Sequence, residues 1–140
     1  MTTLDHTQAI AGDIQLQTAV PSFMASDVAH TARWYTEQLG FRIAGTVPPA
    51  APYVYASLVR DGIELMLLRR APEDHGPAAV VRREGVWDAY VRMRGVHAFY
   101  ETVRDRDFVR MPLRKQTYGD WEFEVQDPNG YILVFSELIA

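Results

Sequence analysis

Short segments rich in apolar, aromatic and β-branched residues recur along the chain, and each is typical of a β-strand. They occupy 15–24, 41–47, 53–59, 63–68, 86–93, 108–115, 121–126 and 131–137. Two other segments, 28–39 and 95–106, carry apolar residues at helical spacing. The predicted order is therefore β-α-β-β-β, and it occurs twice.

Local signals define the ends of these elements. Asp27 can cap the first helix through its carboxylate, and Gly40 is typical of a helix C-terminus. Trp34 and Tyr35 are expected to pack this helix against its sheet. Asp61-Gly62 predicts a two-residue hairpin, and Pro112 places 108–115 at a sheet edge.

The second half of the chain repeats the landmarks of the first at a nearly constant offset of 67 or 68 positions. The landmark pairs are Val28 and Val96, Phe41 and Phe108, and Gly62 and Gly130. One half alone would have a marginal core, whereas two halves can share one. We therefore expect one structural domain with a polar lead-in (1–14), a first module (15–69), a connector (70–84) and a second module (85–140).

Composition narrows the class of protein. The 140 residues contain no cysteine, which excludes disulfides, thiolate metal sites and a cysteine nucleophile. A formal net charge of −4 argues against a nucleic-acid partner. No apolar run approaches the roughly 20 residues of a membrane span, and the polar start is unlike a signal peptide. We expect a cytoplasmic protein with no membrane partner.

Several motifs carry a resemblance to a known family over residues 15–137. They are Ala19-Val20-Pro21, Asp27-Val28, Trp34-Tyr35, Gln38-Leu39-Gly40-Phe41, Asp127-Pro128-Asn129-Gly130-Tyr131 and Val134-Phe135-Ser136-Glu137. The chain resembles the vicinal oxygen chelate superfamily, which includes glyoxalase I, extradiol dioxygenases and bleomycin-resistance proteins, and it looks most like the last branch. The resemblance implies an α+β fold in which two β-α-β-β-β modules form a cupped mixed sheet. Helices cover the convex side, ligand binds in the concave side, and a homodimer shares its pockets between subunits.

The resemblance also implies where a metal would bind, at two pairs of strand positions. Those positions carry Val20, Asp88, Met66 and Val134 in this chain. Valine has no donor atom and a thioether is a poor ligand for zinc, iron or manganese, so we expect no metal and no cofactor. The histidines do not restore a site, because all are expected at surface positions away from the cup: His6, His30, His75 and His97.

Strand alternation sorts the remaining side chains between the helices and the cup. The helix-facing set is wholly apolar: Ala19, Pro21, Phe23, Leu65, Leu67, Ala89, Val91, Met93, Leu133 and Phe135. The opposite set is mixed, as expected for an organic-ligand site. With nearby aromatics it supplies the candidate ligand-binding residues Ser22, Tyr55, Glu64, Met66, Trp87, Asp88, Tyr90, Arg92, Tyr118, Trp121 and Val134.

Structural roles compete with ligand binding at these positions. The aromatic rings also suit a core or a dimer interface, and Glu64 suits a solvated strand. Asp88 could pair with Arg92, two residues along the same face. Glu122 and Glu124 alternate with apolar residues, so they share one face, either of solvent or of the cup.

Three functions are compatible with this sequence. The leading hypothesis is metal-independent binding of a small aromatic or cationic molecule in the concave pocket, as in antibiotic sequestration by bleomycin-resistance proteins. The alternative is a glyoxalase- or dioxygenase-like enzyme (lyase, isomerase or dioxygenase) with an unorthodox site, for which Asp88, Glu64 and Tyr90 are the catalytic candidates. A third possibility is a regulatory module whose cup receives a protein.

Overall fold

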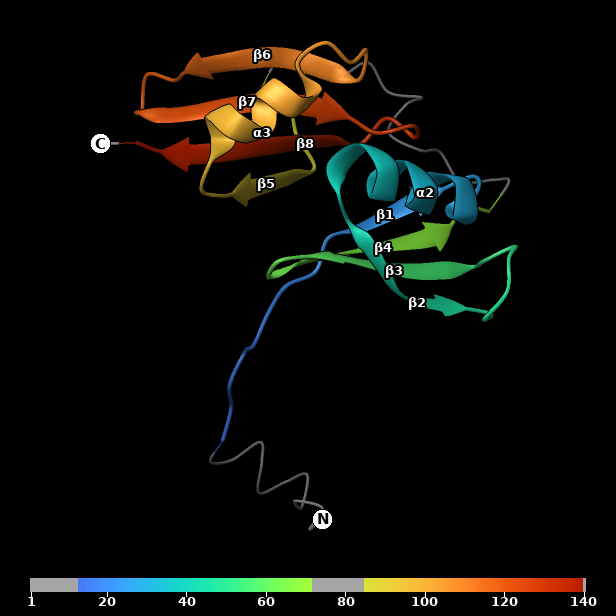
Figure 1. Cartoon of the computed structure of the whole chain (residues 1–140). Helices are drawn as coiled ribbons and strands as arrows, with labels where there is room; N and C mark the ends of the chain where they lie inside the picture. Colours follow the sequence, from blue (N-terminus) through green and yellow to red (C-terminus); the bar gives the residue numbers. More distant parts are fainter. Residues whose placement is uncertain (1–12, 72–84, 140) are drawn as a thin grey trace.

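The computed structural model describes residues 13–71 and 85–139 and contains the repeated β-α-β-β-β order (Figure 1). The first module consists of β1 (Ser22–Ala25), α2 (Val28–Leu39), β2 (Arg42–Val47), β3 (Tyr55–Arg60) and β4 (Ile63–Arg69). The second consists of β5 (Ala89–Arg92), α3 (Val96–Val103), β6 (Val109–Lys115), β7 (Asp120–Gln126) and β8 (Ile132–Leu138). In this part of the chain no helix is long and apolar enough to cross a membrane.

Each module forms its own four-stranded mixed sheet. The strand orders are β1-β4-β3-β2 and β5-β8-β7-β6, so the two sheets have the same topology. The first strand of each module pairs in parallel with the last, and the other pairings are antiparallel. Each helix lies across one face of its own sheet (Figure 1). The α+β fold with two β-α-β-β-β modules is therefore confirmed, and β6, which contains Pro112, is an edge strand as expected.

The helix signals also have their expected effect. The Oδ1 atom of Asp27 accepts a hydrogen bond from the backbone N–H of His30 at 3.0 Å, which caps α2. Gly40 ends the helix in the left-handed region, with φ of 73°. The second helix is shorter than predicted, because Gly95 takes the capping position and the helix ends at Val103.

The first strand of each module is also shorter than predicted. Ser22 lies opposite Met66, and at this register position 18 would lie opposite the hairpin glycine, Gly62. At this register, residues before position 19 extend past the start of β4 at Ile63. Pro21, next to β1, still joins the sheet, because its carbonyl accepts the backbone N–H of Met66 at 2.9 Å. Figure 1 shows the chain before β1 (blue) leading away from both modules, and Leu16 is 95% exposed.

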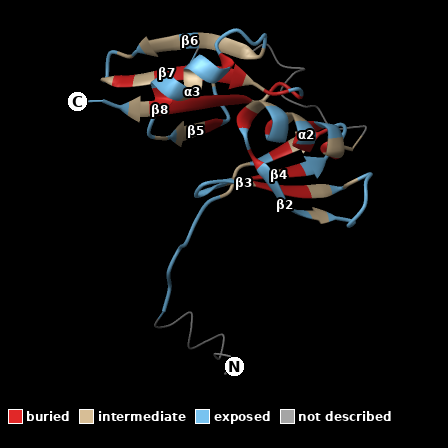
Figure 2. Cartoon of the chain, viewed as in Figure 1, coloured by how far each residue is buried: buried red, intermediate tan, exposed pale blue. Residues whose placement is uncertain are grey.

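The core lies between each helix and its sheet and continues from one module to the other as a single cluster. Figure 2 shows buried residues concentrated in the central strands of both sheets. The largest fully buried side chains include Tyr35 and Leu39 of α2, Leu65 of β4 and Phe123 of β7. The helix-facing strand residues predicted from alternation belong to this cluster or pack against it from Phe23 onward, whereas Ala19 is exposed and Pro21 is half-buried. Residues of both modules therefore contribute to one hydrophobic cluster.

Polar contacts join the two modules where the turn between β7 and β8 meets α2. The hydroxyl of Tyr35 donates to Asp127 Oδ2 at 2.7 Å, and both residues are buried. Asp127 Oδ1 accepts the backbone N–H groups of Asn129 and Tyr131, and the side-chain amide of Asn129 donates to Thr31 Oγ1 at 2.9 Å. The DPNG turn thus positions the second module against the helix of the first.

Candidate functional site

Each sheet has a second face, opposite its helix, which we call the cup face. Alternation along the strands separates the two faces: the helix-facing Leu65 and Leu67 are fully buried, whereas Glu64 and Met66, which alternate with them, are half-buried. In the first module the cup face carries Ser22, Met24, Tyr55, Ser57, Val59, Glu64, Met66 and Leu68. In the second it carries Tyr90, Arg92, Glu122, Glu124, Ile132, Val134 and Ser136.

The cup face of the first sheet is largely apolar and open. Leu68 is 41% exposed, and Met66 lies beside Ser22 across the β1–β4 pair. The polar side chains Ser57 and Glu64 on this face are joined by a 2.6 Å hydrogen bond from Ser57 Oγ to Glu64 Oε2. The serine therefore occupies one oxygen of the carboxylate that the sequence predicts as a ligand contact.

The cup face of the second sheet carries a buried polar cluster centred on Tyr90. The strand β8 lies between β5 and β7, and the side chain of Tyr90 reaches across it. The Tyr90 hydroxyl lies 2.6 Å from Glu122 Oε2, 2.9 Å from Asp120 Oδ2 and 2.9 Å from Ser136 Oγ. Ser136 Oγ is 3.0 Å from Asp120 Oδ2, and the Tyr118 hydroxyl is 2.6 Å from Glu122 Oε1. We call these five residues the acidic cluster.

The acidic cluster has fewer protons than contacts. Its five oxygen–oxygen contacts are served by three hydroxyl protons, one each from Tyr90, Tyr118 and Ser136. Two contacts therefore lack a hydroxyl proton of their own. Hydrogen bonds from Tyr90, Ser136 and Arg92 lower the pKa of Asp120, so this carboxyl group is ionised at neutral pH and supplies no proton. A ligand that brings N–H donors or positive charge would complete the cluster.

The phenols of the cluster are held in their neutral form. Burial, followed by the hydrogen bond to Glu122, raises the pKa of Tyr90 far above its ordinary value. Burial and the same carboxylate also raise the pKa of Tyr118. Both residues therefore act as hydrogen-bond donors near neutral pH, because neither phenol ionises there.

The arginine of the cup face pairs with a different acid from the one expected. Arg92 donates to Asp120 Oδ2 at 3.0 Å, and its guanidinium lies 5.4 Å from the centre of the Tyr90 ring. Arg92 therefore does not pair with Asp88, which the sequence left possible. Asp88 Oδ2 instead accepts the backbone N–H of Ile132 at 2.9 Å. Asp88 lies just before β5 and next to Ile132, the first residue of β8. Its bond to the Ile132 amide therefore links the starts of these two strands.

Aromatic side chains flank the acidic cluster on its exposed side. The ring centres of Trp87 and Tyr90 are 5.5 Å apart, and Trp87 is 42% exposed. Tyr118 is 58% exposed, although its hydroxyl reaches the buried Glu122. Trp121 does not join them: its ring lies 4.9 Å from that of His97 on α3, so it belongs to the helix side of the sheet.

The structure resolves the face of β7 that alternation alone left open. Phe123 and Val125 are fully buried in the core, and Glu122 and Glu124 therefore lie on the cup face. Asp120 precedes Glu122 by two residues and shares its face. Asp120, Glu122 and Ser136 were not among the predicted ligand contacts, although the alternating acids of β7 were a usable signal for two of them.

The three catalytic candidates have separate structural partners. Glu64 bonds Ser57 in the first sheet, Asp88 bonds the Ile132 amide, and Tyr90 belongs to the acidic cluster. Within residues 13–71 and 85–139 no hydrogen bond or ion pair links these three groups to one another. Tyr90 thus contacts two carboxylates, whereas Glu64 contacts a serine and Asp88 a backbone amide.

The positions at which the family binds metal do not fit a divalent ion in this chain. Val134 is fully buried and apolar, Val20 has no donor atom, and Met66 has only a thioether. Asp88 is the one carboxylate among the four positions, and one of its oxygens already accepts a backbone N–H. Among the described residues no three His, Asp or Glu side chains converge as a metal site. His30 and His97 lie on the helices, and His6 and His75 lie outside the described residues.

Comparison of sequences identifies the family. The model of the Glyoxalase/Bleomycin resistance protein/Dioxygenase superfamily matches residues 3–135 of this chain. A search of curated proteins found no match.

Comparison of structures shows the same fold in several proteins. TioX from Micromonospora sp. ML1 superposes with a TM-score of 0.69 at 17% identity, covering 88% of this chain and 99% of TioX. The bleomycin-binding protein of Streptomyces verticillus, solved with copper(II)-bleomycin, has a TM-score of 0.63 at 24% identity, with 87% and 96% covered. The bleomycin resistance determinant encoded on transposon Tn5 has a TM-score of 0.67 at 19% identity, with 89% and 100% covered. The chain belongs to the glyoxalase/bleomycin resistance protein/dioxygenase superfamily.

Proposed function

We propose that this protein binds a small cationic aromatic molecule on the cup face of its second sheet, without a metal ion held by the protein. The observation that carries the proposal is the acidic cluster, in which two nearly buried carboxylates share too few protons. Sequestration of the molecule requires no bond to be made or broken, and affinity comes from charge and ring burial.

The charge of Glu122 is available to a ligand. Its oxygens accept hydrogen bonds from the neutral phenols of Tyr90 and Tyr118, and it forms no ion pair within the described ranges 13–71 and 85–139. An ammonium or guanidinium group that replaced the Tyr118 hydroxyl at Oε1 would meet an uncompensated negative charge. The exposed side chain of Tyr118 has space to turn outward for this exchange.

The flat part of the ligand has a surface nearby. The exposed Trp87 ring lies against Tyr90, and the exposed Tyr118 bonds Glu122. Such rings stack on planar groups and attract cations. Two of the superfamily structures that share this fold were solved with bleomycin bound. A bleomycin-like glycopeptide is therefore the first ligand to test.

The pocket is proposed to be completed in a homodimer. The cup face of the first sheet exposes Leu68 and half-exposes Met66, which are apolar groups suited to burial by a ligand or a second subunit. β1 and β5 are unpaired sheet edges within the described residues, and such edges are available for pairing. On this basis the first sheet of one subunit faces the second sheet of the other.

The test is isothermal titration calorimetry with metal-free bleomycin in buffer containing EDTA, with the mass of the complex measured by light scattering. We expect saturable binding, one ligand per chain, to a dimer. Glu122→Gln removes one charge from the cluster and should weaken binding by about 10- to 100-fold, equivalent to roughly 1.5–3 kcal/mol for a charged hydrogen bond.

Matched controls separate the site from general charge effects. Glu37→Gln removes the same charge from an exposed position on α2 and should leave binding unchanged. Trp87→Ala should weaken binding without disturbing the buried cluster. Equal affinity of Glu122→Gln and the unmodified protein would contradict the proposed site. Stoichiometric zinc, iron, nickel or manganese in the purified protein would contradict metal independence and favour the enzymatic alternative.

A further inference from the structure

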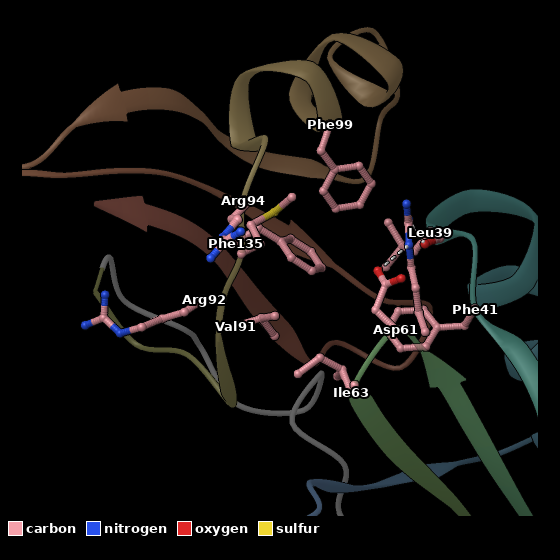
Figure 3. Close-up of a pocket in the computed structure, with 12 residues that line it drawn as sticks. Leu39, Phe41, Asp61, Ile63, Val91, Arg92, Arg94, Phe99 and Phe135 are labelled. Atoms are coloured by element: carbon pink, nitrogen blue, oxygen red, sulfur yellow. Dashed lines mark hydrogen bonds and ion pairs between the residues drawn. The ribbon is translucent and has the colours of Figure 1, made fainter. Parts of the chain in front are cut away.

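A cavity lies between the two modules, and its lining contains none of the five residues of the acidic cluster. It has a volume of about 420 Å³, within the roughly 300–1,000 Å³ range of small-molecule sites. Figure 3 shows its lining residues coming from the β3–β4 hairpin and the end of α2 on one side and from β5, β8 and α3 on the other. Apart from Arg92, which also belongs to the cup face, its strand residues lie on the helix-facing sides of the sheets. The cavity therefore differs from the cup.

The walls of this inter-module cavity are apolar and partly aromatic. The first module contributes Leu39, Phe41 and Ile63, and the second contributes Val91, Phe99 and Phe135. Phe99 and Phe135 meet edge to face with their ring centres 5.0 Å apart, and Phe41 and Phe135 are almost fully buried. Rings arranged in this way present both faces and edges to a flat molecule.

Three arginines, Arg60, Arg92 and Arg94, line this cavity. The guanidinium of Arg60 is fixed: it donates to the Leu39 carbonyl at 2.6 Å and lies 5.1 Å from the centre of the Phe99 ring. Glycine at position 40 leaves room for this guanidinium, because a Cβ atom there would lie 2.8 Å from Arg60 Nη1. Arg60 thereby connects the end of α2 to α3 across the junction. Asp61 lies 3.8 Å from Arg60 Nε and offsets part of its charge.

Arg94 is the cation that a ligand could recruit. It lines the cavity, is exposed, and makes no hydrogen bond or ion pair in the described parts of the chain. Arg92 also borders the cavity, but it donates to Asp120 of the acidic cluster, and Figure 3 shows its side chain directed away from the aromatic rings. The arginines outnumber the single acid of the lining, although the chain as a whole is negatively charged.

We propose that the inter-module cavity is a second binding site, for a small organic anion with a flat apolar body, such as an aromatic carboxylate. Its rings lie against Phe99 and Phe135, and its carboxylate pairs with Arg94, supported by the charge of Arg60. The cavity would bind an anion, whereas the acidic cluster would bind a cation, so the two sites take different ligands. Because both modules contact the ligand, binding also stabilises their relative position.

The experiment uses 2-naphthoate as the anionic probe and 2-naphthamide as its uncharged analogue of the same shape. Backbone amide signals are followed by ¹H–¹⁵N NMR while each probe is titrated into the full chain. We expect saturable shifts with naphthoate at 61–63 and 91–94, and an affinity at least fivefold lower for the amide. Arg94→Gln should weaken naphthoate binding at least fivefold and leave the weaker amide binding unchanged.

Two controls make the outcome specific. Arg33→Gln removes the same charge from an exposed position on α2 and should bind naphthoate as the unmodified protein does. Glu122→Gln should also leave naphthoate binding unchanged, so the result is independent of the proposed function of the cup. Equal binding of the acid and the amide, an equal loss in Arg33→Gln and Arg94→Gln, or shifts confined to the cup face would each overturn the proposal.

Discussion

The contact between Tyr35 and Asp127 offers a direct test of how the modules are held together. Tyr35→Phe removes the hydroxyl that donates to Asp127 Oδ2 at 2.7 Å and keeps the ring, which packs edge to face on Trp34 and Phe41. The change therefore isolates one hydrogen bond between α2 and the DPNG turn. Asp127 retains the backbone donors on its other oxygen, and Oδ2 is left buried without the phenol.

The expected loss follows from the charge of the acceptor. A buried hydrogen bond to a charged group contributes about 1.5–3 kcal/mol, so the free energy of unfolding should fall by about that amount. For a chain of this size the midpoint of thermal unfolding should fall by roughly 5–10 °C. Urea unfolding followed by circular dichroism gives the free energy directly.

The loss should depend on pH. Burial raises the pKa of Asp127, whereas the bond from Tyr35 lowers it, because the phenol stabilises the carboxylate. Since the folded-state pKa lies above the unfolded value, ionisation of Asp127 costs stability as the pH rises through this window. The Tyr35 bond offsets that cost. The difference between the variant and the unmodified protein should therefore be larger at pH 7 than at pH 4.

A control variant distinguishes this contact from a general effect of removing a phenol. Tyr100 packs on Phe123, and its hydroxyl makes no hydrogen bond among the described residues. Tyr100→Phe should change the free energy of unfolding by less than about 0.5 kcal/mol. The reasoning is refuted if Tyr35→Phe costs no more than Tyr100→Phe, or if its cost grows as the pH is lowered.

Two further predictions concern the acidic cluster and the end of α2. Since burial holds the pKa of Tyr90 far above its ordinary value, Tyr90→Phe should leave the phenolate absorbance of the folded protein unchanged up to roughly pH 11. In concentrated urea the unmodified protein should show one more tyrosine ionising near pH 10 than the variant does. A difference in phenolate absorbance between the two folded proteins below pH 11 would contradict this account. Gly40→Ala should lower the free energy of unfolding by about 1–3 kcal/mol, because alanine disfavours a φ of 73° and its Cβ would displace Arg60. Urea unfolding measures this loss. Gly45→Ala is the control, because a Cβ atom there meets open space and the loss should be much smaller.

Local periodicity accounts for most of what could be predicted about the fold. The caps at Asp27 and Gly40, the Asp61-Gly62 hairpin and the edge position of Pro112 each depend on residues close together in the chain. Strand alternation likewise assigned the strand residues from Phe23 onward to the correct face. The first strands were predicted too long, because the start of a strand depends on its pairing with a distant partner, and β1 finds its partner 44 positions away.

The sequence by itself determined the repeated β-α-β-β-β order, the two faces of each sheet and the absence of a metal-ligating set at the family positions, because these depend on periodicity and residue type. Only the tertiary structure decided which acids surround Tyr90, why Asp88 bonds Ile132 rather than Arg92, and that Trp121 packs on α3. Those contacts join side chains from separate strands and helices. The inter-module cavity was likewise invisible to alternation, because it forms where two separately periodic modules meet.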